Sequence, residues 1–243
     1  MDFKTIFAIS FGPGIFWMIY LYKKDKLEPE PKSLVIKIFF LGLLAAIPIA
    51  IVETFFTVSR FWLLILVAPV IEEFGKYLVV KKYAYPSPEF NEPMDGIIYA
   101  SAAALGFASI ENLGYIYGTY SKTNALVSTE AAATAAITIA VMRALLSVPG
   151  HAIWSSMWGY ELGKAKFLPE TEGKKIVARG LFLAMFLHGV FNFMTTLGGI
   201  ALIALAIGIF YMWKMLNRRI KEAEMISPHK DSEQTDHDEI YPV

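Results

Sequence analysis

Residues 60–80 read RFWLLILVAPVIEEFGKYLVV, an apolar run interrupted at its middle by Glu72, Glu73 and Lys76. As a helix, this run is long enough to cross about 30 Å of hydrocarbon. A charged side chain at the centre of such a helix costs about 2.5–3.5 kcal/mol even on the gentler insertion scale. The run is therefore stable in a membrane only if these side chains face a protein interior or a water-filled cavity. Ionisable residues in that setting are candidates for a functional site.

The composition of the whole chain is typical of a membrane protein. Of the 243 residues, 56% are hydrophobic and 18% are charged, whereas soluble proteins average about 45–50% apolar and about 25% charged residues. The apolar residues gather in seven segments, near 5–22, 34–56, 60–80, 95–119, 131–163, 176–196 and 199–216. We therefore predict an all-α polytopic membrane bundle of about seven transmembrane helices, forming one domain over residues 1–216.

Lysine and arginine are concentrated in alternate polar segments of the chain. With seven spans, one side of the membrane holds most of them, in residues 23–33, 81–94, 164–175 and 217–243. The opposite side holds little beyond Lys4, Arg60 and Lys122. Because Lys and Arg accumulate on the cytoplasmic side, we expect the N-terminus outside and the C-terminus inside.

Two segments need separate interpretation. Residues 131–163 are long for one crossing, but splitting them would move the lysines of 164–175 to the outside. We expect a single tilted helix there, bent near Pro149. Residues 217–243 are polar and acidic, which predicts a disordered cytoplasmic tail.

Several classes of protein are excluded by what the chain lacks. It has no cysteine, which excludes a catalytic thiol, a thiolate metal site and a disulfide. Its net charge is zero and no basic patch is interleaved with aromatic residues, so nucleic acid is not an expected partner. The first apolar run lacks a small-residue cleavage site, which favours a retained helix over a signal peptide.

The charges of residues 60–80 are arranged on neighbouring helix faces. Glu72 and Lys76 are four residues apart and share a face, and Glu73 lies one turn from Lys76. A structural ion pair explains one carboxylate beside one ammonium group. It does not explain the second carboxylate, so we favour a functional role.

Other predicted spans carry polar residues of the same kind. Counted along the helices, the two histidines within spans lie at a depth similar to the glutamate pair, and Glu111 lies nearer the outer leaflet. A single buried Glu or His is often only a hydrogen-bonded packing residue. Several such residues in one bundle favour a shared polar cavity instead. The candidate site residues are Glu72, Glu73, Lys76, Glu111, His151, His188 and Asn192.

A cavity of this composition is suited to the activation of water. Burial and mutual repulsion make one carboxylate of a pair a better general base. Histidine and asparagine side chains can donate hydrogen bonds to a developing oxyanion. The sequence has no G-x-S-x-G elbow and no H-E-x-x-H helix, so hydrolases built on those motifs are not indicated.

Four motifs in order carry a resemblance to a known family. They are E-E-x-x-K at 72–76, F-x-x-x-E-N at 107–112, R-A-L-L…H at 143–151 and H-G-x-x-N at 188–192. Together they resemble the PrsW family of intramembrane proteases, over roughly four-fifths of the chain.

The resemblance implies a multi-pass protease of the bacterial cytoplasmic membrane. Its implied reaction is site-1 cleavage of a membrane-tethered anti-sigma factor in a stress response. By analogy with the related CAAX prenyl endopeptidases and bacteriocin-immunity proteins, Glu72 and Glu73 supply the water-activating carboxylate. In the same analogy, His188 and Asn192 stabilise the oxyanion and His151 is a further polar member. Glu111 stands where the prenyl-protein branch has a histidine, which argues against a prenylated substrate.

The cofactor and two rival functions stay open at this point. Glu73, His151 and His188 are acceptable zinc ligands, but a mechanism based on glutamate alone also fits. Chains of Glu and His also form proton relays in transporters and channels, although no inverted repeat or pair of broken helices is present. A non-catalytic immunity or scaffold protein is the third alternative, and it predicts that no intramembrane Glu or His affects phenotype.

Overall fold

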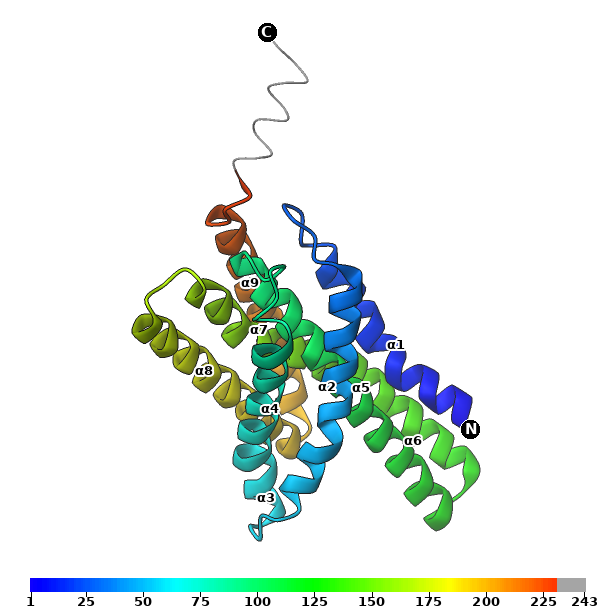
Figure 1. The fold of residues 1–243 in the computed structure, drawn as a ribbon. Coiled ribbons are helices and arrows are strands. Elements are labelled where there is room, and N and C mark those ends of the chain that lie inside the picture. The colour runs from blue at the N-terminus through cyan, green and yellow to red at the C-terminus, as the bar shows by residue number, and fades with distance from the viewer. Residues whose placement is uncertain (231–243) are drawn as a thin grey trace.

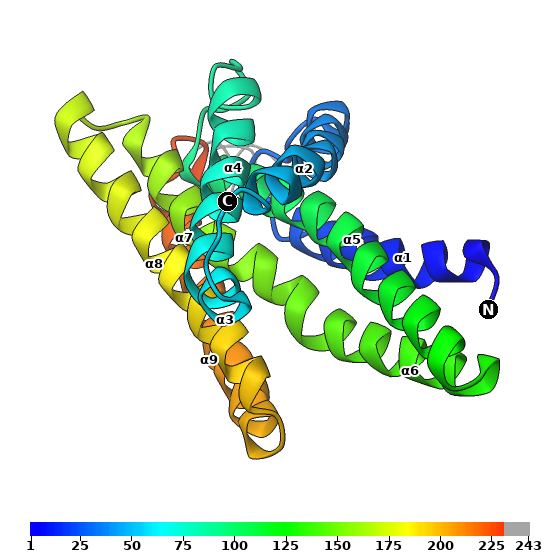
Figure 2. The ribbon, with the colours of Figure 1, turned by 90° about the horizontal axis from the view of Figure 1, so that it is seen from below.

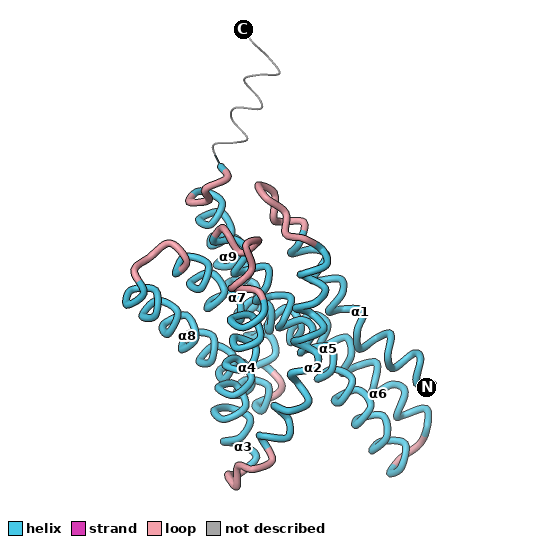
Figure 3. The backbone as a smooth tube through the Cα atoms, in the orientation of Figure 1, coloured by secondary structure: helices cyan, strands magenta, loops and turns pink. Residues whose placement is uncertain are grey.

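The structure is a computed structural model that describes residues 1–230. Within these residues the chain consists of helices and the turns that join them (Figure 3). The predicted all-α bundle is confirmed. The elements are α1 (Phe3–Tyr22), α2 (Lys32–Glu53), α3 (Arg60–Trp62), η1 (Leu63–Val67), α4 (Ala68–Tyr83), α5 (Pro93–Leu126), α6 (Thr129–Met142), η2 (Arg143–Ser147), α7 (Val148–Ala165), α8 (Glu170–Leu197) and α9 (Ile200–Met225).

These elements form seven helical segments, because α3, η1 and α4 are continuous and so are α6, η2 and α7. Six of the segments are long and apolar enough to cross a membrane. The seventh runs from Arg60 to Tyr83 and contains Glu72, Glu73 and Lys76. Residues 129–165 form one helical run, as expected for the long fifth span.

Each of the two interrupted segments contains a π-helical turn just before a proline. The turn η1 ends two residues before Pro69, and η2 ends two residues before Pro149. A proline in a helix lacks an N–H group and its ring clashes with the carbonyl four residues earlier. The wider π turn accommodates that clash, and such turns are frequent at functional sites. The predicted irregularity near Pro149 therefore has a counterpart at Pro69.

The helix α5 is the centre of the bundle. From Pro93 to Ser109 every residue is buried, and α5 packs against α1, α2 and α7 (Figures 1 and 2). Gly96 on α5 faces Gly159 on α7 so closely that a Cβ on Gly96 would meet the carbonyl oxygen of Gly159. A helix buried on all sides needs small residues where it meets its neighbours.

The connections alternate between the two ends of the bundle (Figure 1). Residues 23–31, 84–92 and 166–169 lie at the same end as the end of α9, and residues 54–59, 127–128 and 198–199 lie at the other. Large apolar side chains such as Phe182, Ile200 and Ile203 are exposed on the outer helices. This surface suits a multi-pass membrane protein, and the lysine-rich segments share one end as expected.

The helix α9 extends beyond the predicted start of the tail. It continues to Met225, so residues 217–225 of the expected disordered tail are helical. Arg219 pairs with Glu161 of α7 at 2.9 Å, and Arg218 pairs with Glu222 at 2.8 Å. The polar composition of these residues predicted a disordered tail, but in the structure their ion pairs stabilise the last turns of α9. The remaining expectation of disorder concerns residues 231–243, which lie outside the described part of the chain.

Candidate active site

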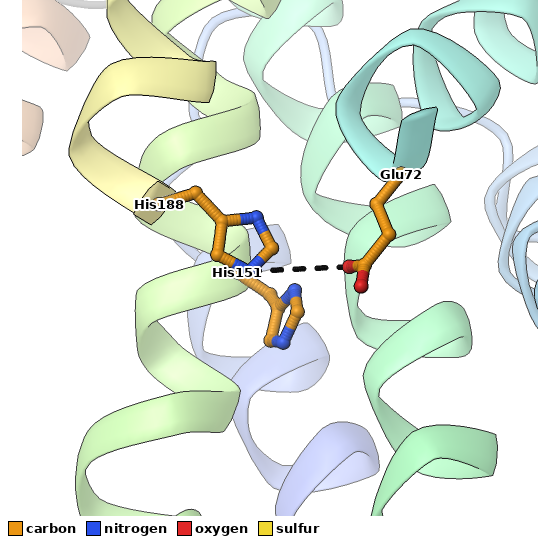
Figure 4. Close-up of side chains that lie close together, drawn as sticks. All are labelled: Glu72, His151 and His188. Atoms are coloured by element: carbon orange, nitrogen blue, oxygen red, sulfur yellow. Dashed lines mark ion pairs between the residues drawn. The ribbon is translucent and has the colours of Figure 1, made fainter. Parts of the chain in front are cut away.

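Four helices bring the predicted site residues together inside the bundle. Glu72, Glu73 and Lys76 come from α4, Glu111 from α5, His151 from α7, and His188 and Asn192 from α8. Figure 4 shows Glu72 facing the two histidine rings, with a dashed line for its ion pair with His188. All seven side chains predicted from the sequence lie in or beside this cluster.

Lys76 is the charged centre of the cluster. Its side chain is fully buried, and its ammonium nitrogen lies 2.9 Å from Glu73 Oε1 and 3.4 Å from Glu72 Oε2. The same nitrogen lies 3.0 Å from His151 Nδ1 and 4.4 Å from the centre of the Phe107 ring. Contacts with these partners offset the free-energy cost of removing the ammonium group from water.

Glu73 is surrounded by hydrogen-bond donors. Its Oε2 accepts from Ser155 Oγ at 2.7 Å and from Trp158 Nε1 at 3.0 Å. Its Oε1 accepts from Lys76 and lies 3.3 Å from His188 Nδ1. The side chain is completely buried. Both carboxylate oxygens of Glu73 are therefore held by the protein.

Glu72 has a different environment from its neighbour. Its Oε2 lies 3.4 Å from Lys76 Nζ and 3.9 Å from His188 Nε2. Neither distance is that of a short charge-assisted hydrogen bond. Glu72 also lines a cavity that lies between α2, α4 and α5. Of the two glutamates, Glu72 is the one that faces open space.

Glu111 joins the cluster through the other side of His151. Its Oε2 lies 2.9 Å from His151 Nε2 and accepts from an Arg143 terminal nitrogen at 3.0 Å. Arg143 Nε also donates to Asn112 Oδ1 at 2.5 Å. Glu111 therefore contacts the same histidine as Lys76, although the sequence indicated a position nearer the outer leaflet.

Asn192 connects the cluster to the π turn η1. Its Nδ2 donates to the carbonyl oxygen of Leu64 at 2.9 Å. In the second π turn, the carbonyl oxygen of Ala144 accepts from Trp17 Nε1 at 3.2 Å. Both widened turns thus present a carbonyl group to a side chain from another helix, which fixes their shape.

Two adjoining cavities, of about 450 and 370 Å³, open beside the cluster. Glu72 lines the first, and Arg143 and His151 line the second. Both are lined by Arg60, Leu64, Glu111, Tyr115 and Asn192. Because these residues are shared, the two cavities form one groove across the cluster, and volumes in this range are typical of ligand sites.

The comparison with known proteins identifies the family. A family model described as "PrsW family intramembrane metalloprotease" matches residues 30–216. The chain belongs to the PrsW family. The "Protease PrsW" of Oceanobacillus iheyensis is 34% identical over 226 residues, covering 90% of this chain and 96% of that protein. The "Protease PrsW" of Geobacillus kaustophilus is 30% identical over 225 residues, covering 90% and 92%. No solved structure matches the chain.

Membership of the PrsW family makes the chain an intramembrane protease. The predicted enzyme class and family are confirmed. The transporter and the non-catalytic scaffold are set aside, because the family and its relatives are proteases.

The family description raises the question of a metal ion. Glu72, His151 and His188 each offer one ligand atom, and these atoms lie within 4.8 Å of one another. Two histidines and one glutamate are a common ligand set of catalytic zinc. Glu73 lies beside His188 Nδ1 and Glu111 beside His151 Nε2, as carboxylates often do at the far nitrogen of a zinc-bound histidine. The ligand types present fit a zinc ion, with Glu72 rather than the expected Glu73 in the group. Because Glu111 contacts His151 Nε2, the ion would bind His151 Nδ1 and displace the contact of that nitrogen with the Lys76 ammonium group.

Sequence reasoning missed several members of the site. Ser155 and Trp158 hold Glu73. Arg143, whose Nε donates to Asn112, holds Glu111; both stood in the family motifs but were not among the predicted site residues. Ser155 and Trp158 follow His151 by four and seven residues, so helical spacing already placed them on its face. Serine and tryptophan are common in membrane helices, however, so their residue types alone do not indicate a functional site.

Proposed function

We propose that the chain hydrolyses a peptide bond of a membrane-tethered protein, with Glu72 as the carboxylate that activates water. The observation that supports this role is the contrast between two neighbours. Glu73 has both oxygens occupied by buried donors, whereas Glu72 faces the groove with longer contacts. A general base needs a free oxygen beside the reacting water.

The proposed reaction uses the groups around that oxygen. Water attacks the carbonyl carbon of the scissile bond while one of its protons passes to the Glu72 carboxylate. The carbonyl oxygen becomes an oxyanion, stabilised by N–H donors from His188 and Asn192. When the C–N bond breaks, the proton on Glu72 passes to the leaving nitrogen.

The other ionisable groups position the reacting ones. Glu73 orients His188, and Lys76 sets the charge next to Glu72. Glu111, itself held by Arg143, orients His151. In the alternative mechanism with a metal, a zinc ion held by Glu72, His151 and His188 would supply Lewis-acid chemistry in place of the base and oxyanion-donor roles of Glu72 and His188.

We propose a membrane-tethered anti-sigma factor as the substrate and the bacterial cytoplasmic membrane as the location, as the family resemblance implies. The groove reaches the end of the bundle opposite the lysine-rich loops, because its lining includes Glu53 at the end of α2 and Arg60 at the start of α3. With the expected orientation, a substrate enters from the outer side.

The proposal is tested with purified full-length protein in lipid nanodiscs and a candidate anti-sigma factor. Cleavage sites are mapped by mass spectrometry. We expect Glu72→Gln to reduce the cleavage rate by at least about a hundredfold, the contribution of a general base. Glu130→Gln, at an exposed carboxylate of α6, serves as the matched control and keeps the full rate.

Two further experiments test whether a metal ion is needed and whether the substrate must be anchored in the membrane. If cleavage continues after verified removal of metal, the zinc ion has no part in the reaction and the glutamate mechanism stands alone. The same substrate without its transmembrane segment should be cut much more slowly. Full activity of Glu72→Gln would contradict the role of Glu72.

A further inference from the structure

The helices α4 and α8 form a wedge that opens towards the lysine-rich end of the bundle (Figures 1 and 2). Near the outer end they are in close contact, because a Cβ on Gly189 of α8 would meet the carbonyl oxygen of Ile65, just before α4. Towards the lysine-rich end α8 leans away from α4 (Figures 1 and 2). A cavity of about 450 Å³ lies between them there, with Leu162 and Ala165 of α7 in its lining.

The inner part of this wedge is apolar. Phe74 and Tyr77 line it from α4, and Val177 and Leu181 line it from α8. Phe74 is exposed at the surface of the helix. Such a surface at membrane depth is suited to a hydrocarbon chain rather than to water.

The mouth of the wedge is basic. Lys81 of α4 and Lys174 of α8 line it from opposite sides. Lys166, in the turn before α8, donates to the carbonyl oxygen of Tyr85 at 2.9 Å and adds its charge to that of Lys81. Among the lining residues the one carboxylate is Glu170, which pairs with Lys174 at 2.5 Å.

Lys81 forms no ion pair with any carboxylate of the described residues. Its ammonium nitrogen instead lies 3.4 Å from the centre of the Tyr85 ring. The charges that act on it are those of Lys166 and Lys174. The wedge therefore combines an apolar interior with an excess of positive charge at its mouth.

We propose that this wedge binds one anionic phospholipid, with the phosphate at Lys81 and Lys174 and an acyl chain against the apolar interior. Basic pockets between transmembrane helices on the cytoplasmic side bind anionic headgroups in this way. A free phosphate would use only the mouth, whereas a phospholipid matches both parts of the cavity. The proposal is independent of the proteolytic reaction, because lipid binding is measured without a substrate.

The test is native mass spectrometry of the full chain in a neutral detergent, titrated with phosphatidylglycerol or phosphatidylcholine. We expect the wild type to retain phosphatidylglycerol preferentially. Lys81→Gln/Lys174→Gln should bind it about tenfold more weakly, since each lysine near a headgroup contributes to attraction. The matched control is Lys82→Gln/Lys175→Gln, which makes the same charge change one residue along the same two helices, outside the cavity lining. It should keep the wild-type affinity.

Two other measurements separate the parts of the site. Ala178→Phe, which fills the cavity at an exposed lining residue, should also weaken retention of the phospholipid. Millimolar inorganic phosphate should not displace it. Equal effects of the two lysine pairs would mean a diffuse electrostatic attraction and would overturn the proposal, as would equal retention of the two lipids.

Discussion

Glu72 and Glu73 are adjacent in the chain but meet different neighbours. Successive side chains on a helix point about 100° apart, so one carboxylate faces α7 and the other faces the groove. Glu73 meets Ser155 and Trp158 of α7. Glu72 meets the cavity and the Nε2 side of His188. Glu73 thus holds the cluster together, and Glu72 is free to take part in the reaction.

This contrast predicts opposite effects on stability. Glu73→Gln removes the closest partner of the buried Lys76 ammonium, and breaking a buried pair costs about 3–5 kcal/mol. We expect the thermal midpoint of the purified protein to fall by several degrees, since about 1 kcal/mol corresponds to about 2–4 °C at this size.

Glu72→Gln should leave the thermal midpoint almost unchanged, because its contact with Lys76 is longer. Thermal unfolding in one detergent, followed for both variants and the wild type, gives the comparison. If Glu72→Gln is the more destabilising of the two, Glu72 is the structural partner of Lys76 and Glu73 the general base, contrary to our assignment.

At the scale of the elements, the site depends on how closely α5 and α7 approach. Gly96, Gly159 and Gly163 lie where the two backbones touch. The contact sets the position of α7, which carries His151, Ser155 and Trp158. Packing of small residues at such contacts is a main source of association between membrane helices.

A pair of glycine substitutions on α5 tests this contact. Gly96→Ala places a methyl group against the carbonyl oxygen of Gly159, so we expect a clear loss of thermal stability and a reduced cleavage rate. Gly118→Ala is the matched control, because nothing lies within 4 Å of its added Cβ. The control should be neutral or slightly stabilising, as alanine favours a helix over glycine by roughly 0.8–1 kcal/mol. Equal stability of the two variants would show that the close approach is not needed.

The positions of the helices were more predictable from the sequence than the contacts between them. Apolar runs located all seven helical segments, and Pro149 marked the irregularity in the fifth. The contacts between helices are not written in one-dimensional periodicity, however. Helical periodicity placed Glu72 and Lys76 on one face of their helix, but it did not show which face α7 packs against. The choice between Glu72 and Glu73 therefore stayed open. For the same reason the ion pair between Glu111 and Arg143, which joins α5 to η2, was not expected.

A cluster of acidic residues joins two loops at the lysine-rich end. Asp25 Oδ2 accepts from the backbone N–H of Glu30, and Glu30 accepts a hydrogen bond from the Tyr99 hydroxyl. Burial, together with the charges of Glu92, Asp95 and Glu28, raises the pKa of Asp25 to about 7, although the hydrogen bond from the backbone N–H of Glu30 acts to lower it. The folded protein therefore binds a proton at Asp25 that the unfolded chain, with an ordinary pKa near 4, has already released.

The sign of the pH dependence follows from this shift. Where the folded state binds more protons than the unfolded state, stability falls as pH rises. We expect the contribution of Asp25 to be lost between about pH 4 and pH 7. Asp25→Asn should flatten the fall of the thermal midpoint over this range by a few degrees, whereas Glu130→Gln should not. An unchanged slope in Asp25→Asn would contradict the role of the buried acid.

At the scale of the whole molecule, the direction from which a substrate arrives depends on which end of the bundle faces the cytoplasm. The lysine-rich segments share one end. The groove reaches the other end, because Glu53 and Arg60, on either side of the connection there, are part of its lining. If Lys and Arg mark the cytoplasmic side, the protease receives its substrate from outside. The wedge between α4 and α8 then faces the inner leaflet. Both proposals about ligands therefore depend on one orientation.

The absence of cysteine makes this orientation directly testable. Single cysteines are introduced at exposed Ser121, near the end of α5, and at exposed Thr171, in the first turn of α8. A membrane-impermeant maleimide applied to intact cells should label Ser121→Cys but not Thr171→Cys. After the membrane is permeabilised, both should be labelled, which controls for the accessibility of each site. The reverse pattern would place the groove on the cytoplasmic side, and a substrate cut from the outside would then be impossible.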